Sequence, residues 1–156
     1  MMSITIRRAV HADLPILLQF EQGIIIAERP FDATLRDGDV RYYDIPALID
    51  SPTAELLVAE HDGEVIGSGF ARIESSQGFL RHTRHAYLGF VYVKPGYRGQ
   101  RISATILDAL KIWIRQQDIT EMRLEVYADN TSAITAYTRA GFNRHLIVLR
   151  GAVDPE

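Results

Sequence analysis

The chain has 156 residues, of which 47% are hydrophobic and 24% charged, and its formal net charge is −3. This length suits a single domain over residues 1–156 with a substantial core. The absence of cysteine excludes disulfides and thiolate zinc sites, and the net charge argues against general nucleic-acid binding. No apolar run approaches the roughly 20 residues that span a membrane, so we expect a cytoplasmic enzyme or binding protein.

The first third of the chain predicts one strand and two helices. Apolar residues alternate with polar ones over 4–6, which is typical of a short strand. Asp13 can cap the helix that follows it, and we expect this helix to fade between residues 23 and 29. A second short helix is expected over 45–49.

The middle third predicts a hairpin, a central strand and a long helix. Residues 55–61 and 64–73 read as strands joined at Asp62-Gly63, a strong hairpin signal. Residues 86–93 are apolar on both faces, which indicates a strand that is buried on both sides. Apolar residues recur at helical spacing over 102–117, so a helix is expected there.

The last third predicts a strand, a helix and a closing strand. Residues 121–127 alternate cleanly, and 129–132 offer several N-cap candidates for the next helix. Gly141 follows that helix as a C-cap glycine should, and residues 146–149 read as a final strand. The expected order is β-α-α-β-β-β-α-β-α-β, an α/β fold with helices packed against a mixed sheet.

One stretch, residues 92–106, runs from a strand through a Pro/Gly turn and a basic loop into a helix. Such a connection leaves backbone N–H groups unpaired at the positive end of the helix dipole. With Arg98 and Arg101 beside them, these groups can form a cradle for a diphosphate. The alternative is an ordinary strand–helix connection, and the loop alone does not decide between the two.

Two blocks of sequence carry a recognisable signature: residues 91–103 read VYVKPGYRGQRIS, and residues 124–142 read LEVYADNTSAITAYTRAGF. Together they resemble the GNAT superfamily of acyl-CoA-dependent N-acyltransferases. Both blocks stand in the order and spacing of that family, and the second is similar to that of bacterial enzymes that acetylate protein N-termini. The resemblance implies a GNAT-like fold, acetyl-CoA as a co-substrate and no metal.

The phosphate loop departs from the family pattern. That pattern, Arg/Gln-x-x-Gly-x-Gly/Ala, falls on residues 98–103, and its two small positions hold Arg101 and Ser103. Because backbone N–H groups bind the phosphate, the side chains can change where the backbone keeps its conformation. Arg101 adds positive charge and Ser103 can cap the helix, although weaker cofactor binding is the alternative.

The resemblance also implies which residues bind the cofactor. The backbone of the strand end should hydrogen-bond the pantetheine arm, the loop should wrap the diphosphate, and Asn130 should contact the arm or act only as a cap. The full set is Val91, Tyr92, Val93, Arg98, Gly99, Gln100, Arg101, Ile102, Ser103, Ala104 and Asn130.

Acyl transfer to an amine needs a base, a stabilised oxyanion and an acid for the departing thiolate. By resemblance Glu125 is the general base, directly or through a water, and its alternative is a surface glutamate paired with Arg123. Tyr137 matches the general acid, and its alternative is a core tyrosine beside Ile134. Without cysteine, the amine must attack acetyl-CoA directly in a ternary complex.

The expected function is acetyl-CoA-dependent acetylation of a primary amine, and the alternative is a non-catalytic acyl-CoA-binding or regulatory module. Because members of the superfamily are often dimers, a homodimer is possible. The acidic N-terminal third should hold the acceptor amine. Its candidates are Glu21, Glu28, Asp32, Asp37, Asp39 and Asp44.

Overall fold

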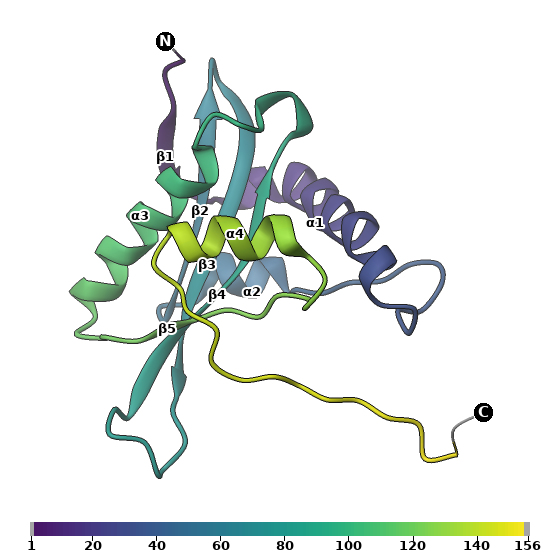
Figure 1. Cartoon of the computed structure of the whole chain (residues 1–156). Coiled ribbons are helices and arrows are strands. Elements are labelled where there is room, and N and C mark those ends of the chain that lie inside the picture. The colour runs from purple at the N-terminus through teal and green to yellow at the C-terminus, as the bar shows by residue number, and fades with distance from the viewer. Residues whose placement is uncertain (1, 155–156) are drawn as a thin grey trace.

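The computed structural model describes residues 2–154 and is built on one five-stranded sheet in the order β1-β2-β3-β4-β5 (Figure 1). The first four strands pair antiparallel and β5 joins β4 in parallel, so the sheet is mixed and the expected fold class is confirmed. The strands are β1 (Thr5–Arg8), β2 (Ala54–His61), β3 (Glu64–Ser75), β4 (Arg84–Val93) and β5 (Met122–Arg123).

Four α-helices cover the two faces of this sheet. Residues of α1 and α2 join one core cluster with β2, β3 and β4, whereas α3 packs on the opposite face with half-buried residues of α4. The helices are α1 (Leu14–Glu28), α2 (Ile45–Asp50), α3 (Ile102–Gln116) and α4 (Thr131–Arg139). Within the described residues, no helix is long and apolar enough to cross a membrane.

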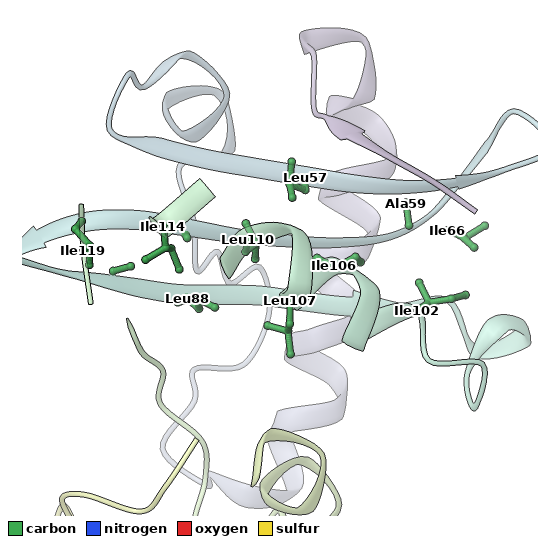
Figure 2. Close-up of a cluster of buried hydrophobic side chains, with 12 residues drawn as sticks. Leu57, Ala59, Ile66, Leu88, Ile102, Ile106, Leu107, Leu110, Ile114 and Ile119 are labelled. Atoms are coloured by element: carbon green, nitrogen blue, oxygen red, sulfur yellow. The ribbon is translucent and has the colours of Figure 1, made fainter. Parts of the chain in front are cut away.

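The hairpin between β2 and β3 forms at the predicted dipeptide. Asp62 and Gly63 both have positive φ, 51° and 78°, as a type I′ turn requires. The hydrophobic face of α3 then packs over these strands, as Figure 2 shows for Ile106 and Leu110, which are fully buried. This packing fixes the start of α3 relative to the end of β4.

The helix α1 continues through Gly23 and ends at Glu28, within the range where we expect it to fade. A Cβ at Gly23 would lie 2.7 Å from the Tyr92 hydroxyl, so the glycine allows the ring of Tyr92 to pack against the helix. Contrary to the prediction, the side chain of Asp13 does not cap α1. Its carboxylate instead accepts hydrogen bonds from Arg7 and from the backbone N–H of Val10.

Two predictions at the end of the chain need correction. Of the strand expected over 121–127, only Met122 and Arg123 pair with β4. The final strand expected over 146–149 is wrong, because these residues are exposed and form no ladder in the described structure. An apolar run favours a strand, but a strand also needs a neighbouring edge, which residues 2–154 do not bring to this segment.

Candidate active site

A bulge in β4 opens the sheet beside the predicted cofactor loop. Between Ser68 and Phe70 of β3 there is one residue, whereas β4 has two residues over the same stretch, and the first of them, Phe90, adopts a φ of 58°. The Ser68 hydroxyl donates a 2.8 Å hydrogen bond to the Phe90 carbonyl and holds the bulge in place. A bulge of this kind bends a strand and re-aims its end.

β4 and β5 separate after Tyr87, just before the bulge. They pair only at Ala86 with Met122 and at Tyr87 with Arg123. The part of β4 from residue 88 to 93 therefore has an edge, facing away from β3, with no ladder partner in the described structure. This edge includes Val91, Tyr92 and Val93, whose backbone groups were expected to meet pantetheine.

The loop before α3 carries a run of unpaired donors. The first N–H group of α3 that has a backbone acceptor is that of Thr105, which donates a 3.0 Å hydrogen bond to the Arg101 carbonyl. Within the described chain, the N–H groups of residues 99–104 have no hydrogen-bond acceptor. They stand at the N-terminus of a helix, where backbone donors and the helix dipole both favour an anion.

Two residues of this loop have the positive φ angle that glycine usually adopts. Gly99 has a φ of 80°, and Arg101 has a φ of 61° at the N-cap of α3. Arg101 therefore accepts the left-handed conformation, which costs an L-residue about 1–2 kcal/mol. Ser103 does not cap the helix, contrary to expectation, because it lies inside the first turn and Arg101 holds the cap position.

A pocket of about 240 Å³ joins the β4 edge, the loop and α4. It brings together most of the predicted cofactor residues with Tyr137. Of the predicted set, Gln100, Ala104, Asn130 and Glu125 do not line it. The pocket is lined by Val91, Tyr92, Val93, Tyr97, Arg98, Gly99, Arg101, Ile102, Ser103, Ala133, Ala136 and Tyr137.

Tyr137 is held by the end of α4. Gly141 donates to the Thr138 carbonyl at 3.1 Å and Phe142 to the Tyr137 carbonyl at 3.0 Å, the bond pair of a Schellman motif. The rings of Tyr137 and Phe142 pack edge to face, 6.0 Å apart. Burial, and then the charge of Glu28, raise the pKa of Tyr137, so its hydroxyl keeps its proton at neutral pH.

Asn130 occupies the cap position at the other end of α4. Its side-chain oxygen accepts a hydrogen bond from the Ala133 N–H at 3.2 Å. The capping role weighed from the sequence is therefore present in the structure. A contact between Asn130 and the cofactor stays a prediction.

Glu125 projects toward the α1 face of the sheet. Its carboxylate accepts a 3.0 Å hydrogen bond from the Tyr87 hydroxyl, and the burial of Tyr87 together with this bond raises the tyrosine pKa to about 12. The alternative pairing with Arg123 does not form, because Arg123 binds Glu121 instead. Glu125 is exposed and free to receive a further partner on its other oxygen.

The acidic residues of the N-terminal third have different roles. Glu21 is fully buried, and its carboxylate accepts the N–H groups of Tyr42 and Tyr43 at 2.9 and 2.8 Å. It anchors the segment that crosses α1, and so it is not placed to hold an acceptor. Asp44 caps α2 through the Ala47 N–H at 3.2 Å.

Glu28 and Asp32 lie nearer to the opening between β4 and the residues that follow β5. The Tyr127 hydroxyl, just beyond β5, donates to Asp32 at 3.0 Å. Hydrogen bonds from Thr34, and then this one, lower the pKa of Asp32 to about 2, so it is ionised at neutral pH. Burial raises the pKa of Glu28, whose charge acts on Tyr43, Tyr127 and Tyr137.

Tyr87 and Tyr127 lie at the candidate site, and sequence reasoning gave neither of them a role. Alternation over 121–127 puts Tyr127 on the same face of the chain as Glu125, but it does not show which groups that face meets. Its partner Asp32 is 95 residues away in the chain, and Glu125 is 38 residues from Tyr87. The register of β4 with β5 brings Glu125 to Tyr87, and the packing of α1 against the sheet brings Asp32, in the segment after that helix, to Tyr127. Among the described residues, no group of three or more His, Cys, Asp or Glu is placed to hold a metal ion.

Three comparisons agree with this architecture. The chain is 24% identical to an aminoglycoside N(6')-acetyltransferase type 1 of Stenotrophomonas maltophilia, over 97% of this chain and 95% of the relative. It is 26% identical to a mycothiol acetyltransferase of Sanguibacter keddieii, over 78% of this chain but 39% of the relative. The crystal structure of a predicted acetyltransferase with acetyl-CoA from Clostridium acetobutylicum superposes with a TM-score of 0.76, at 18% identity and 97% coverage of both chains.

The family model of the GNAT acetyltransferases matches residues 23–142. That range starts in α1 and ends at the Schellman motif after α4, so it includes the whole of the bulged strand, the loop and the pocket. The protein belongs to the GNAT family of acetyltransferases.

Proposed function

We propose that this protein transfers an acetyl group from acetyl-CoA to a primary amine, by direct attack in a ternary complex. The observation that carries this proposal is the separation of β4 from β5. It leaves an opening through the sheet, with the unpaired N–H groups of residues 99–104 on the α3 side and the Glu125 carboxylate on the α1 side. Two substrates can therefore meet from opposite faces.

The loop residues fit a diphosphate. Six consecutive N–H groups without acceptors, from residue 99 to 104, suit an anion with several oxygens. Arg101 adds a positive charge, while Arg98 is held by the Val93 carbonyl at 2.9 Å. The unpaired edge at 91–93 offers amide partners for a pantetheine arm that extends into the pocket.

Acetyl-CoA supplies an activated thioester, and the chain's own groups supply the proton transfers. We assign Glu125 as the base that takes the proton of the acceptor ammonium, directly or through a water. We assign Tyr137 as the acid, because it lines the pocket beside the β4 edge and its hydroxyl is protonated at neutral pH. Glu28 strengthens this effect, since its charge lies close enough to Tyr137 to oppose ionisation of the phenol.

The acceptor is expected to carry positive charge. Glu28, Asp32 and Glu125 lie on the α1 side of the opening, where they favour an ammonium group over an anion. The relative from Stenotrophomonas maltophilia is an aminoglycoside N(6')-acetyltransferase, which makes aminoglycosides the first acceptors to test. Peptide N-termini, lysine and polyamines complete the panel.

A free-thiol assay tests the proposal directly. Each acceptor is incubated with acetyl-CoA, and a thiol reagent reports the CoA that is released. Because the chain has no cysteine, the protein itself gives no background in this assay. Turnover with at least one cationic amine supports the proposal, and turnover with anionic acceptors alone contradicts the assignment of the acidic side.

Cofactor binding is measured separately from turnover. A ligand at 100 times its dissociation constant stabilises a fold by about 2.7 kcal/mol, so acetyl-CoA and CoA should raise the melting temperature while NAD should not. Stabilisation without turnover on any amine would favour the non-catalytic acyl-CoA-binding module. No stabilisation up to about millimolar acetyl-CoA would contradict cofactor binding itself.

A further inference from the structure

The residues between β5 and α4 carry Glu125 without the support of a strand ladder. β5 has two residues, and in Figure 1 the chain then runs as a coil to α4. Within the described structure, residues 124–126 form no backbone hydrogen bond, so the sheet does not fix their position. Leu124 packs against the core on the α3 face, and the Tyr87 hydroxyl contacts one oxygen of the Glu125 carboxylate. The segment therefore depends on side chains to hold it.

Tyr127 fixes the far end of this segment to the α1 side of the opening. Its ring stacks on that of Phe31, with the ring centroids 6.1 Å apart and the planes inclined by 19°. Its hydroxyl donates a 3.0 Å hydrogen bond to the Asp32 carboxylate. Phe31 and Asp32 stand at the end of η2 (Arg29–Phe31), the short 3-10 helix that directly follows α1. Tyr127 therefore joins the end of α1 to the segment that carries Glu125.

The Asp32 carboxylate is engaged at both of its oxygens. One oxygen accepts the Tyr127 hydroxyl, and the other accepts both the backbone N–H and the hydroxyl of Thr34. The Arg150 guanidinium lies 3.6 Å from that second oxygen, and the Asp32 side chain is only 12% exposed. An acceptor ammonium would have to displace one of these partners. Asp32 is therefore better placed to hold Tyr127 than to bind the acceptor itself.

The bond between Tyr127 and Asp32 joins a neutral phenol to an ionised carboxylate. Hydrogen bonds from Thr34 and Tyr127 keep Asp32 ionised at neutral pH, because they lower its pKa to about 2. Burial, and then the bond to Asp32, raise the pKa of Tyr127 to about 12, so the phenol remains a donor. Charge-assisted hydrogen bonds of this kind are about twice as strong as neutral ones.

The position of Tyr127 bears directly on that of Glu125. The two residues are separated only by Val126, and in an extended chain they lie on the same face. Two residues of extended chain span about 7 Å, so a shift of Tyr127 is passed on to Glu125. A catalytic group that is misplaced by about 1 Å can cost about 100-fold in rate.

We propose that Asp32 and Tyr127 are positioning residues for the proposed base. They form a clasp between the end of α1 and the segment after β5, and this clasp sets where the Glu125 carboxylate meets the acceptor amine. This role rests on the proposed function, because it requires that Glu125 takes a proton from the acceptor. Asp32 acts through Tyr127 and does not touch the acceptor. Loss of the clasp should therefore lower kcat and leave the KM for the acceptor nearly unchanged.

Steady-state kinetics of three single variants tests the clasp, with acetyl-CoA and the amine of the panel that the wild type acetylates fastest. Tyr127→Phe removes the donor and Asp32→Ala removes its acceptor, so each should lower kcat about 10- to 100-fold. Asp32→Asn should stay within about 3-fold of the parent, because its amide keeps a hydrogen bond to the Tyr127 hydroxyl without the charge. The matched control is Asp108→Ala, which removes an exposed carboxylate from α3 and should leave kcat unchanged.

The asparagine variant separates positioning from direct recognition of the acceptor's charge. If Asp32 held the ammonium itself, Asp32→Asn would be as impaired as Asp32→Ala, and the loss would appear in KM. The double variant Asp32→Ala/Tyr127→Phe should be no worse than the poorer single variant, because both changes remove the same bond. In a Glu125→Gln background, Tyr127→Phe should cost less than about 3-fold further, since no base remains to be positioned.

Thermal unfolding confirms that each variant is folded before its kinetics are compared. If Asp32→Ala fails to fold, Tyr127→Phe in the wild-type and Glu125→Gln backgrounds still decides. The clasp alone would be contradicted by a wild-type kcat in Tyr127→Phe, by additive losses in the double variant, by a KM effect common to both Asp32 variants, or by an undiminished loss in the Glu125→Gln background. A wild type that acetylates no amine of the panel would contradict the proposed function itself, and the clasp with it.

Discussion

The two sides of β4 differ in how completely they are paired. Toward β3, β4 pairs along its length, interrupted only at the bulge. Toward β5, it pairs at Ala86 and Tyr87 and then loses its partner. The first side is part of the antiparallel frame of β1 to β4, and the second is the opening where we propose that the site lies.

The paired side of β4 belongs to the part of the fold that stabilises it, whereas the unpaired side carries the polar groups that are available to a ligand. The antiparallel frame is covered by α3 on one face and by α1 and α2 on the other, and its buried residues are almost all apolar. The opening instead collects tyrosines, carboxylates and unpaired N–H groups. Groups left unsatisfied within the chain are available to a ligand, and the packed frame offsets what they cost.

The largest expected effect is on turnover, at Tyr137. Tyr137→Phe keeps the ring against Phe142 but removes the proton that the departing thiolate needs, so kcat should fall about 10²–10⁴-fold with KM little changed. Tyr97→Phe is the matched control, because Tyr97 lines the same pocket but its hydroxyl donates to Glu64 at 3.3 Å. Steady-state kinetics separate the two, and full activity of Tyr137→Phe would leave it only a packing role.

A substitution that creates a cavity under α3 should destabilise the antiparallel frame. Ile106 is fully buried against the hairpin strands, so Ile106→Ala should lower the free energy of unfolding by about 2–5 kcal/mol. Ile112 is 55% exposed on the same helix, and Ile112→Ala should change it by less than about 0.5 kcal/mol. Urea unfolding measures both variants. Equal effects would mean that α3 does not clamp the frame.

Glu125→Gln tests the opening from the acceptor side. Without the base, kcat/KM should fall about 100-fold near pH ~6, where the acceptor amine is protonated. Part of the loss should be recovered near pH ~9, where free amine accumulates. Tyr87→Phe is the control, since it removes the hydrogen bond but leaves the carboxylate. A uniform loss at every pH would argue against a role for Glu125 in deprotonation.

Acid should weaken the antiparallel frame through Asp13. Hydrogen bonds from Arg7, at 2.8 and 2.9 Å, hold the pKa of Asp13 below its ordinary value. Its contribution to stability is therefore complete above about pH 4, the pKa in the unfolded chain, and is lost as the pH falls through the lower folded pKa.

Asp13→Asn should cost about 1–3 kcal/mol at neutral pH, and its stability should depend less on acid than that of the parent. The control is Asp50→Asn, because Asp50 pairs with His11 at an exposed site. Unfolding by urea at a series of pH values measures both. An unchanged acid dependence in Asp13→Asn would contradict the assignment.

The smallest expected effect is at the backbone of the cofactor loop. Arg101→Ala keeps a side chain in the left-handed conformation, whereas Arg101→Gly relieves it, so the glycine variant should be about 0.5–1 kcal/mol more stable than the alanine variant. Both variants lose one positive charge, and acetyl-CoA should bind both more weakly than the parent, chiefly at low salt. Equal melting temperatures would show that this loop is not strained.

The local features of the fold were predictable from short stretches of sequence. The Asp62-Gly63 turn, the helix from residue 102 and Gly141 at the end of α4 each depend on neighbours within a few residues. The loop at 98–104, which we propose binds the cofactor, could be predicted for the same reason, because its donors and its arginines are adjacent in the chain.

Features that join distant segments could not be predicted in this way. Sequence periodicity alone placed Glu125 on the polar face of its strand, but only the parallel register of β5 with β4 sets it against Tyr87. The packing of α1 on the sheet brings Asp32, in the segment after that helix, to Tyr127, and the burial of Glu21 depends on the segment that crosses α1. Strand alternation determines which face a side chain takes, and tertiary packing decides which groups it meets there.

The limit of prediction from sequence is clearest in the C-terminal arm, residues 143–150. Its residues by themselves determine a strong preference for an extended, covered strand, because they are apolar on both faces. Whether that preference becomes a strand was decided by the tertiary structure, which holds the arm at Phe142 and Arg150 and leaves it no edge to join. A β-strand is stabilised by hydrogen bonds to another strand, so its formation depends on a partner that its own sequence does not contain.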